Sequence, residues 1–143
     1  MGSEMCIRDR SVTADENGAA MLTGILICVA DATEAVERYE RFTGKPSRPS
    51  GDGYRIALDR GEIAICTPDE CAVLIPGVDI PDLPFMAAVS IVSGDIARTR
   101  TYLAGKGIRL ATDGEDCLIT DTASGMGAHF VFHAPGREPF ALP

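Results

Sequence analysis

Two periodicities of hydrophobic residues follow one another between residues 22 and 44. Residues 22–29 form a short, nearly continuous apolar run rich in β-branched side chains, typical of a strand covered on both faces. After Asp31 the apolar residues recur at helical spacing, and charged residues fill the positions between them. These inward positions are Ala35, Val36, Tyr39 and Phe42. Asp31 or Thr33 can cap the helix and Gly44 can end it, so the pattern predicts a buried strand leading into an amphipathic helix.

Shorter elements follow before the pattern restarts. They are an irregular edge strand or loop at 45–53, strands at 54–58 and 62–66, a short helix at 68–75 and an extended, proline-containing linker at 76–84. The two strands are separated by a tight turn in which Gly61 occupies the position that needs a positive φ. Thr67 precedes Pro68, and Glu70 follows three residues after Thr67, so we expect Thr67 to cap the short helix.

The pattern of strand, helix and strands then occurs a second time. It predicts a strand at 85–92, a helix at 95–106 with Ile96, Thr99, Tyr102 and Leu103 inward, and strands at 108–112, 116–121 and 128–134. Five identical pairs are 63 positions apart, namely Val29 and Val92, Tyr39 and Tyr102, Gly44 and Gly107, Gly51 and Gly114, and Ile56 and Ile119. Pro68 and Pro135 are 67 positions apart, so the second copy is expected to hold four more residues, in the turn at 122–127.

Each copy has the order βαβββ, which is too small to close its own sheet. We therefore expect an α+β fold in which two βαβββ modules form a curved, cup-like mixed sheet with helices outside. The domain would span residues 21–135, as modules 21–68 and 85–135 joined by a linker at 69–84. Residues 136–143 would form a C-terminal tail.

Residues 1–20 are predicted to be a non-native or disordered leader. The first ten, MGSEMCIRDR, have no periodicity and resemble translated cloning sequence, so they are left out of the fold prediction. If this segment is artificial, the natural protein would continue upstream, and the chain would be a C-terminal piece of it.

Composition narrows the choice of partners and compartment. A length of 143 residues with 45% hydrophobic residues suits one domain, and a net charge of −8 argues against nucleic acid or an anionic membrane as partner. No apolar run approaches a bilayer-spanning length, and no hydrophobic signal sequence is visible, so the expected compartment is the cytoplasm. The five cysteines form no CxxC pair, and Cys28 and Cys66 lie in predicted strands, which favours buried reduced thiols over a metal site or disulfide framework.

The segments 22–31, 85–95 and 122–133 resemble the vicinal oxygen chelate superfamily, and within it the glyoxalase-like domain proteins. The resemblance covers residues 22 to about 135 and implies that each module supplies half of a cup. It also implies a divalent metal held by a His or Gln in the first strand and a Glu in the last strand of each module. Those positions fall at Gly24, Ala64, Ala87 and Val131, and none of these side chains can bind a metal. We therefore expect degenerate metal positions and no cofactor.

The remaining candidates are the residues expected to line the cup. The proposed ligand-binding set is Leu26, Arg55, Glu62, Val89, Thr120, His129 and Val131, beside Gly24, Ala64 and Ala87. Arg55 would offer a fixed cation to an anionic ligand if it faces the cup, but a one-residue uncertainty in register leaves its facing open. His129 and His133 share a strand face about 13 Å apart, which is too far to bind one ion together. No Ser-His-Asp or Cys-His set is supported by position, so the catalytic residues are unknown.

Three functions remain open at this point. The first is a domain that binds a small molecule or supports an upstream catalytic module, with a homodimer as an alternative partnership. The second is a metal-dependent lyase, isomerase or dioxygenase that takes its ligands from His129, His133 and Glu62 or from a dimer partner; an active protein would then be a glyoxalase-type lyase or a related enzyme. The third is a cup filled by side chains, in a domain that serves oligomerisation only. Stoichiometric metal in the purified protein would separate the second from the first.

Overall fold

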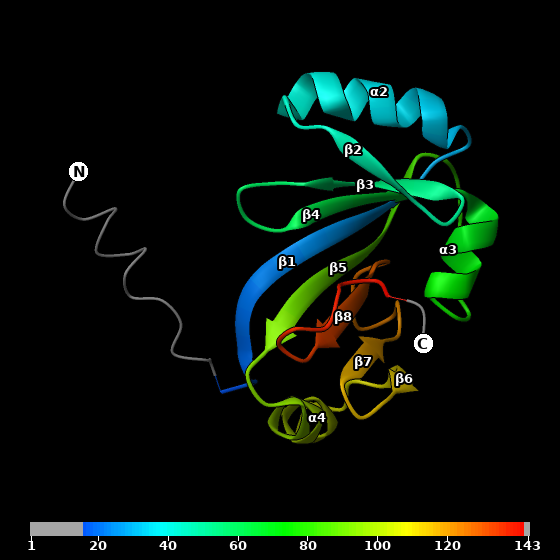
Figure 1. The fold of residues 1–143 in the computed structure, drawn as a ribbon. Helices are drawn as coiled ribbons and strands as arrows, with labels where there is room; N and C mark the ends of the chain where they lie inside the picture. Colours follow the sequence, from blue (N-terminus) through cyan, green and yellow to red (C-terminus); the bar gives the residue numbers. More distant parts are fainter. Residues whose placement is uncertain (1–15, 142–143) are drawn as a thin grey trace.

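The computed structural model describes residues 16–141, so most of the predicted leader, Cys6 included, lies outside the described residues. These residues form one eight-stranded mixed sheet with three helices (Figure 1). The strands are β1 (Ala19–Cys28), β2 (Ser47–Ser50), β3 (Gly53–Ala57), β4 (Glu62–Cys66), β5 (Phe85–Ser93), β6 (Leu110–Asp113), β7 (Cys117–Thr120) and β8 (His129–His133). The helices are α2 (Ala32–Thr43), α3 (Pro68–Leu74) and α4 (Ile96–Gly105).

The strand order is β2-β3-β4-β1-β5-β8-β7-β6, which is the same βαβββ arrangement twice. Within each half the first and last strands run parallel, β1 with β4 and β5 with β8. The halves join where β1 and β5 pair antiparallel, with Gly24 opposite Ser90. The predicted α+β fold with two modules in one curved sheet is confirmed.

The helix ends follow from local sequence in two of the three helices. The Asp31 side chain accepts a hydrogen bond from the Glu34 backbone N–H at 3.0 Å, and Gly44 ends α2 with a φ of +68°. Asp95 caps α4 in the same way, through the Arg98 backbone N–H at 3.1 Å. The prediction for Thr67 is wrong in one respect: α3 begins directly after it, but its side chain makes no capping hydrogen bond.

The two module helices cover the outer face of the sheet, as predicted. Buried residues of α2 pack with Ile56, Ile63 and Ile65, while α4 packs with Leu118 and Phe132. One inward position is wrong, because Phe42 is 85% exposed. It lies in the last turn of α2, beyond the buried residues of the helix, which are Ala32, Ala35 and Val36.

The structure contains the duplication, but residues 63 positions apart no longer occupy equivalent places in the hairpins. Ile56 packs on the helix side of the sheet, whereas Ile119 packs on the opposite face. The pairing of β6 with β7 contains a register irregularity between Leu110 and Thr112, and a shift of one residue moves a side chain to the other face. The extra length is where it was predicted: four residues (58–61) join β3 to β4 and eight (121–128) join β7 to β8.

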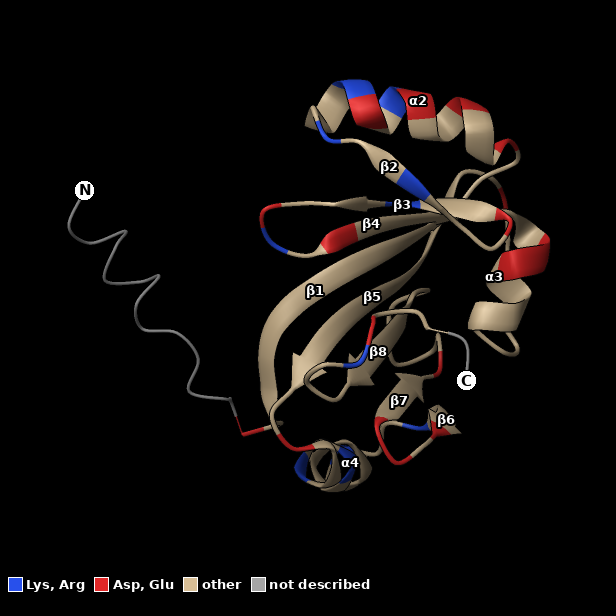
Figure 2. Cartoon of the chain, in the orientation of Figure 1, with Lys and Arg blue, Asp and Glu red and all other residues tan. Residues whose placement is uncertain are grey.

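The face of the sheet opposite α2 and α4 is the inner face of the cup, and we call it the cup face. Its apolar residues come from both halves and from α3, and they are Leu26, Cys28, Ala64, Cys66, Cys71, Ile75, Ala87, Ala88, Ile119, Val131 and Phe140. β1 and β5, the central strands, carry no charged residue, and charge gathers on the helices, loops and outer strands (Figure 2). Within residues 16–141, none of the helices has the length and apolar character needed to cross a membrane.

Candidate functional site

The four degenerate metal positions lie together in the middle of the sheet. Ala64, Ala87 and Val131 are buried in the cup-face cluster. A Cβ added to Gly24 would lie 3.0 Å from Ser90 Oγ and 3.1 Å from the Glu62 carbonyl oxygen, so this glycine leaves a bare spot between two polar neighbours. No side chain at these positions has an N, O or S atom to offer a metal.

The atypical ligand set is also not assembled within one chain. Among residues 16–141, one group of three His, Cys, Asp or Glu residues has all its ligand atoms within 4.8 Å of one another, and it consists of Cys28, Cys66 and Cys71. Glu62, His129 and His133 therefore do not form such a group among these residues. The described residues therefore give no support to a metal site that draws these three ligands from a single chain.

Arg55 faces the cup, which the sequence could not decide. It pairs with Ala64 across the β3–β4 hairpin, and its side chain is 6% exposed. Its guanidinium donates to the Glu62 carboxylate at 2.5 Å, to the Pro139 carbonyl at 2.5 Å and to the Phe140 carbonyl at 2.8 Å. Arg55 therefore fastens the C-terminal segment over the first half of the cup and has little capacity left for a ligand.

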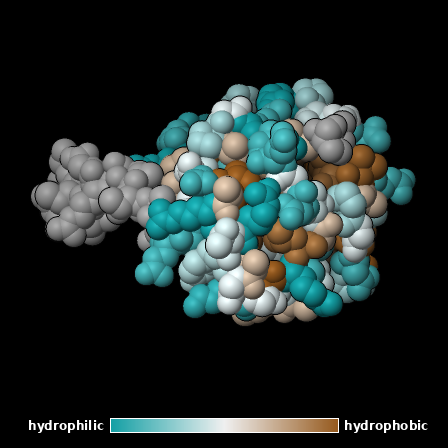
Figure 3. Space-filling model, turned by 90° about the horizontal axis from the view of Figure 1, so that it is seen from below, coloured by the Kyte–Doolittle hydropathy of each residue, from teal (hydrophilic) through white to brown (hydrophobic). Residues whose placement is uncertain are grey.

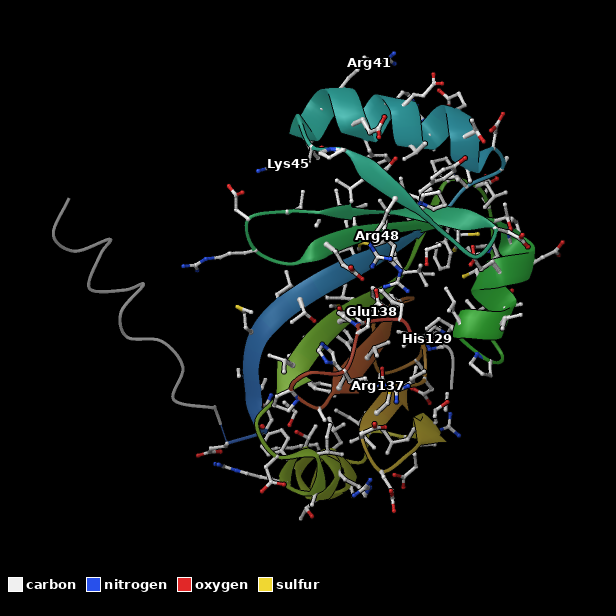
Figure 4. All side chains as sticks on the ribbon, in the orientation of Figure 1. Arg41, Lys45, Arg48, His129, Arg137 and Glu138 are labelled. Carbon is white, nitrogen blue, oxygen red and sulfur yellow. The ribbon has the colours of Figure 1, made fainter. Side chains whose placement is uncertain are left out.

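A second arginine extends this network toward the surface. Arg48 on β2 forms an ion pair with Glu138 of the C-terminal segment, and Glu138 also lies 3.6 Å from Arg55 Nη1 (Figure 4). The Glu62 carboxylate is 13% exposed and lies between the two arginines, 4.0 Å from Arg48. No sequence pattern predicts this arrangement, because residues 48 and 138 are far apart in the chain and the C-terminal segment has no hydrophobic periodicity.

His129 is buried on β8 with a defined tautomer. Its Nδ1 lies 2.6 Å from the Thr120 carbonyl oxygen, which can only accept, so Nδ1 carries the proton. Nε2 then presents a lone pair, and it has no hydrogen-bond partner within the described residues. The Thr120 hydroxyl oxygen accepts a hydrogen bond from the Phe130 backbone N–H at 3.0 Å. Both candidate residues are thus tied to the β7–β8 pairing.

His133 takes part in a chain of hydroxyl groups at the junction of the two halves. Its Nδ1 donates to the Ala134 carbonyl, so Nε2 accepts from the Thr23 hydroxyl at 2.7 Å. Thr23 in turn accepts from the Ser90 hydroxyl at 2.9 Å. Neither Thr23 nor Ser90 stood out in the sequence, since a lone Thr or Ser in an apolar strand has no distinctive spacing.

Val89 does not lie on the cup face. It pairs with Ile25 on β1 and with Phe130 on β8, and both of these pack with the outer helices. The pairing of β1 with β5 shifts register between Leu26 and Ile27, which brings Ala87 and Ala88 into the cup-face cluster together. This irregularity moves Val89 to the helix side, while Leu26 remains in the cup as expected.

The two halves of the cup differ sharply in open space. In the first half, the cavity beside Leu26, Arg55 and Ala64 holds about 10 Å³. In the second half, a pocket of about 320 Å³ opens between α3 and β7. The residues around this α3–β7 pocket are Val73, Leu74, Pro76, Thr112, Gly114, Asp116, Cys117, Ile119, Arg137 and Ala141. In the view from below, brown apolar surface is exposed among teal polar residues (Figure 3).

Arg137 is the charged residue common to this pocket and to a neighbouring cleft. Its Nη1 donates to Asp116 Oδ1 at 2.8 Å, and Asp116 is 56% exposed. The cleft, of about 400 Å³, lies on the other side of the C-terminal segment and includes Thr23, Glu62 and His133. A guanidinium paired only with an exposed carboxylate can exchange that partner for the carboxylate of a ligand.

Three cysteines meet where β1, β4 and α3 come together. The Sγ atoms of Cys28, Cys66 and Cys71 all lie within 4.8 Å of one another, and each residue is at most 1% exposed. The expectation of buried thiols at Cys28 and Cys66 is confirmed. Their convergence was missed because the sequence spacing fits no metal motif; the available signal was that Cys28 and Cys66 each end one of two parallel strands.

Comparison with known proteins gives the fold a family context. The sequence matches no protein-family model and no curated protein. The structure resembles methylmalonyl-CoA epimerase from Mycobacterium tuberculosis, with a TM-score of 0.66 and 18% identity over 92% of this chain and 96% of the other. A methylmalonyl-CoA epimerase in complex with methylmalonyl-CoA and NH₄⁺ gives a TM-score of 0.64 and 11% identity over 84% and 97% of the two chains.

A hypothetical protein from Bacillus halodurans C-125 is similar to the same degree, with a TM-score of 0.60 and 12% identity over 83% and 96% of the two chains. These TM-scores, at identities of 11–18%, show that the chain shares its fold with these proteins. The chain thus has the vicinal oxygen chelate fold that the sequence resemblance predicted.

Proposed function

We propose that this chain is a small-molecule-binding domain whose ligand occupies the α3–β7 pocket, without a metal at Gly24, Ala64, Ala87 or Val131. The observation that carries the proposal is the pocket itself, about 320 Å³ between α3 and the second half of the sheet. This volume is at the lower end of the range typical of ligand sites. A compact organic molecule fits it better than an extended one.

The walls of the pocket favour a ligand with an apolar body and one acidic group. Val73, Leu74 and Ile119 supply apolar surface, and Arg137 supplies a cation at the rim. The overall charge of −8 disfavours ligands that carry several negative charges. Short-chain carboxylic acids with one carboxylate are therefore the preferred ligand class.

The similar structures support this class. Two of them are named as epimerase complexes with methylmalonyl-CoA and with 2-nitronate-propionyl-CoA, which are thioesters of short acyl groups. We also propose that the protein is cytoplasmic. The free buried thiols support this location, because such thiols persist in a reducing compartment. A homodimer or a supporting role toward an upstream module stays a prediction.

Calorimetric titration with a panel of short straight and branched acids, their amides, and methylmalonyl-CoA tests the proposal. We expect at least one acid to bind, and the matching amide to bind more weakly because Arg137 loses its anionic partner. Arg137→Gln should remove this preference for the acid over the amide, lowering affinity for the acid about tenfold.

A matched pair of surface variants locates the site. Val73 is 56% exposed at the pocket, and Phe42 is 85% exposed on α2, so both can take a charge without disturbing the core. Val73→Glu should weaken binding of the acid by about tenfold through like-charge repulsion, and Phe42→Glu should leave it unchanged. If no ligand of the panel binds, or if both variants bind equally well, the proposal is wrong.

The metal-dependent alternative survives only with ligands from a second chain. Elemental analysis of protein purified without chelators, compared between wild type and His129→Ala, measures it directly. A stoichiometric metal that is lost with His129 would favour that alternative over metal-free binding.

A further inference from the structure

The three buried cysteines form a cluster that the proposed ligand site does not use. Cys28 and Cys66 are register partners at the ends of the parallel strands β1 and β4. Cys71 comes from α3, which begins at Pro68, two residues after Cys66. Sheet pairing and a short helix thus place three sulfur atoms within 4.8 Å of one another in the cup-face cluster.

The spacing suits a single metal ion. A Zn–S bond of about 2.3 Å places the sulfur atoms of a thiolate site about 3.8–4.0 Å apart. Separations of up to 4.8 Å require a contraction of less than about 1 Å, which side-chain rotation can supply. Thiolate sulfur is the ligand type that selects soft ions such as Cu⁺ and Zn²⁺.

Protonation in the metal-free cluster is already uneven. Hydrogen bonds from the Cys66 and Cys28 thiols lower the pKa of Cys71, against the effect of burial. The hydrogen bond to Cys71 is the main cause that raises the pKa of Cys66, and burial is the second. For Cys28, burial is the main cause, and it raises the pKa to about 11. Cys71 is therefore the first of the three sulfur atoms to ionise.

The surroundings offer no cation to stabilise further ionisation. Among residues 16–141, the charges that act on these three sulfur atoms are their own and that of Glu70, all of which are negative when ionised. Glu70 Oε2 is itself buried without a hydrogen-bond partner in the described structure. A buried group of potential anions without a counter-charge is costly to ionise unless a cation binds among them.

We propose that Cys28, Cys66 and Cys71 form a thiolate site for one soft d¹⁰ metal ion, Cu⁺ or Zn²⁺. Cu⁺ is satisfied by three sulfur ligands alone. Zn²⁺ takes a fourth ligand, which the three cysteines do not supply. Binding replaces three S–H bonds by metal–sulfur bonds and releases three protons to solvent, with no oxidation or reduction.

The site is separate from the family metal positions. Those positions are occupied by Gly24, Ala64, Ala87 and Val131, whereas the sulfur atoms lie at the far ends of β1 and β4, under α3. Because the cluster is closed, the metal enters during folding or when α3 lifts from the sheet. A bound ion would then hold α3 against both strands.

The test uses reduced, metal-free full-length chain carrying Cys6→Ser, which removes the one cysteine outside the described residues. Competition titrations under nitrogen, with a chromogenic chelator for Zn²⁺ and another for Cu⁺, give stoichiometry and affinity. We expect one ion per chain, a rise in melting temperature on binding, and affinity that increases with pH because protons are released.

Matched cysteine variants assign the site. Cys71→Ser should weaken binding at least 100-fold, while Cys117→Ser, a partly buried thiol outside the cluster, should bind as the parent does. Circular dichroism of both variants checks folding. If Cys71→Ser unfolds, alkylation of the parent with and without metal replaces it, and metal should protect three thiols.

Either of two results would overturn the proposal. One is the absence of binding by both ions at micromolar concentration, and the other is binding that persists in Cys71→Ser.

Discussion

The two halves of the cup have the same βαβββ order and opposite contents. In the first half, α3 packs on the sheet, and Arg55 holds the C-terminal segment so that Phe140 is buried in the cluster. In the second half, the α3–β7 pocket of about 320 Å³ remains open beside Ile119. Duplication therefore supplied two concave surfaces, and the segments outside the repeat decided which of them a ligand can enter.

The difference also changes the role of charged residues. Arg55 is almost fully buried and is committed to Glu62 and two backbone carbonyls. Arg137 faces a pocket and is paired only with an exposed aspartate. An arginine on a concave surface thus predicts a ligand site only when its guanidinium is not already bound by other groups of the chain.

The largest effect should come from breaking the attachment of the tail. Arg55→Met removes the closest cation of the Glu62 carboxylate and the donor to two backbone carbonyl oxygens, so we expect a loss of about 3–5 kcal/mol in unfolding free energy. Urea denaturation followed by circular dichroism measures it. Arg48→Met is the matched control, since Arg48 is 55% exposed and its loss should cost less than about 1 kcal/mol.

The next effect tests how far the Phe140 side chain fills the cup-face cluster. This residue is 4% exposed, and Phe140→Ala should destabilise the chain by about 3 kcal/mol and leave a cavity in the filled half. Comparing denaturation midpoints and slopes separates lost packing from a changed unfolded state. A cost below about 1 kcal/mol would mean that the tail lies on the cup without filling it.

A pair of conservative variants compares the two halves directly. Ile75 is 1% exposed on the filled side, and Ile119 is 6% exposed on the wall of the open pocket. We expect Ile75→Val to cost about 1.5 kcal/mol and Ile119→Val about 0.5 kcal/mol, because a wall that already borders open space has fewer contacts to lose. Equal costs would contradict the contrast between a filled and an open half.

The smallest effect concerns Glu70, whose carboxyl group lies under the first half. Burial raises its pKa above the ordinary value, so its protonated form is favoured in the folded state. Its contribution to stability is therefore complete below the unfolded pKa and is lost as pH rises through the folded pKa. The stability of wild type relative to Glu70→Gln should fall between pH 4 and pH 7, and a rise over that range would contradict the assignment.

The repeat made the fold predictable from sequence, but only down to the level of register. Strand and helix positions, the Asp31 cap and the longer turn in the second copy all follow from local pattern. Val89 was placed wrongly because a register irregularity in the pairing of β1 with β5 reverses the face of a side chain, and no local signal marks it.

The sequence by itself determined the architecture of this protein and showed that Gly24, Ala64, Ala87 and Val131 offer no metal-binding side chain. Hydrophobic periodicity specifies strands and helices because each element must bury one face, and a glycine or alanine cannot bind a metal in any arrangement. Only the tertiary structure decided that Arg55 holds the tail, that one half of the cup stays open and that three cysteines meet. These features join residues distant in the chain, and contacts between such residues depend on packing, which no local pattern records.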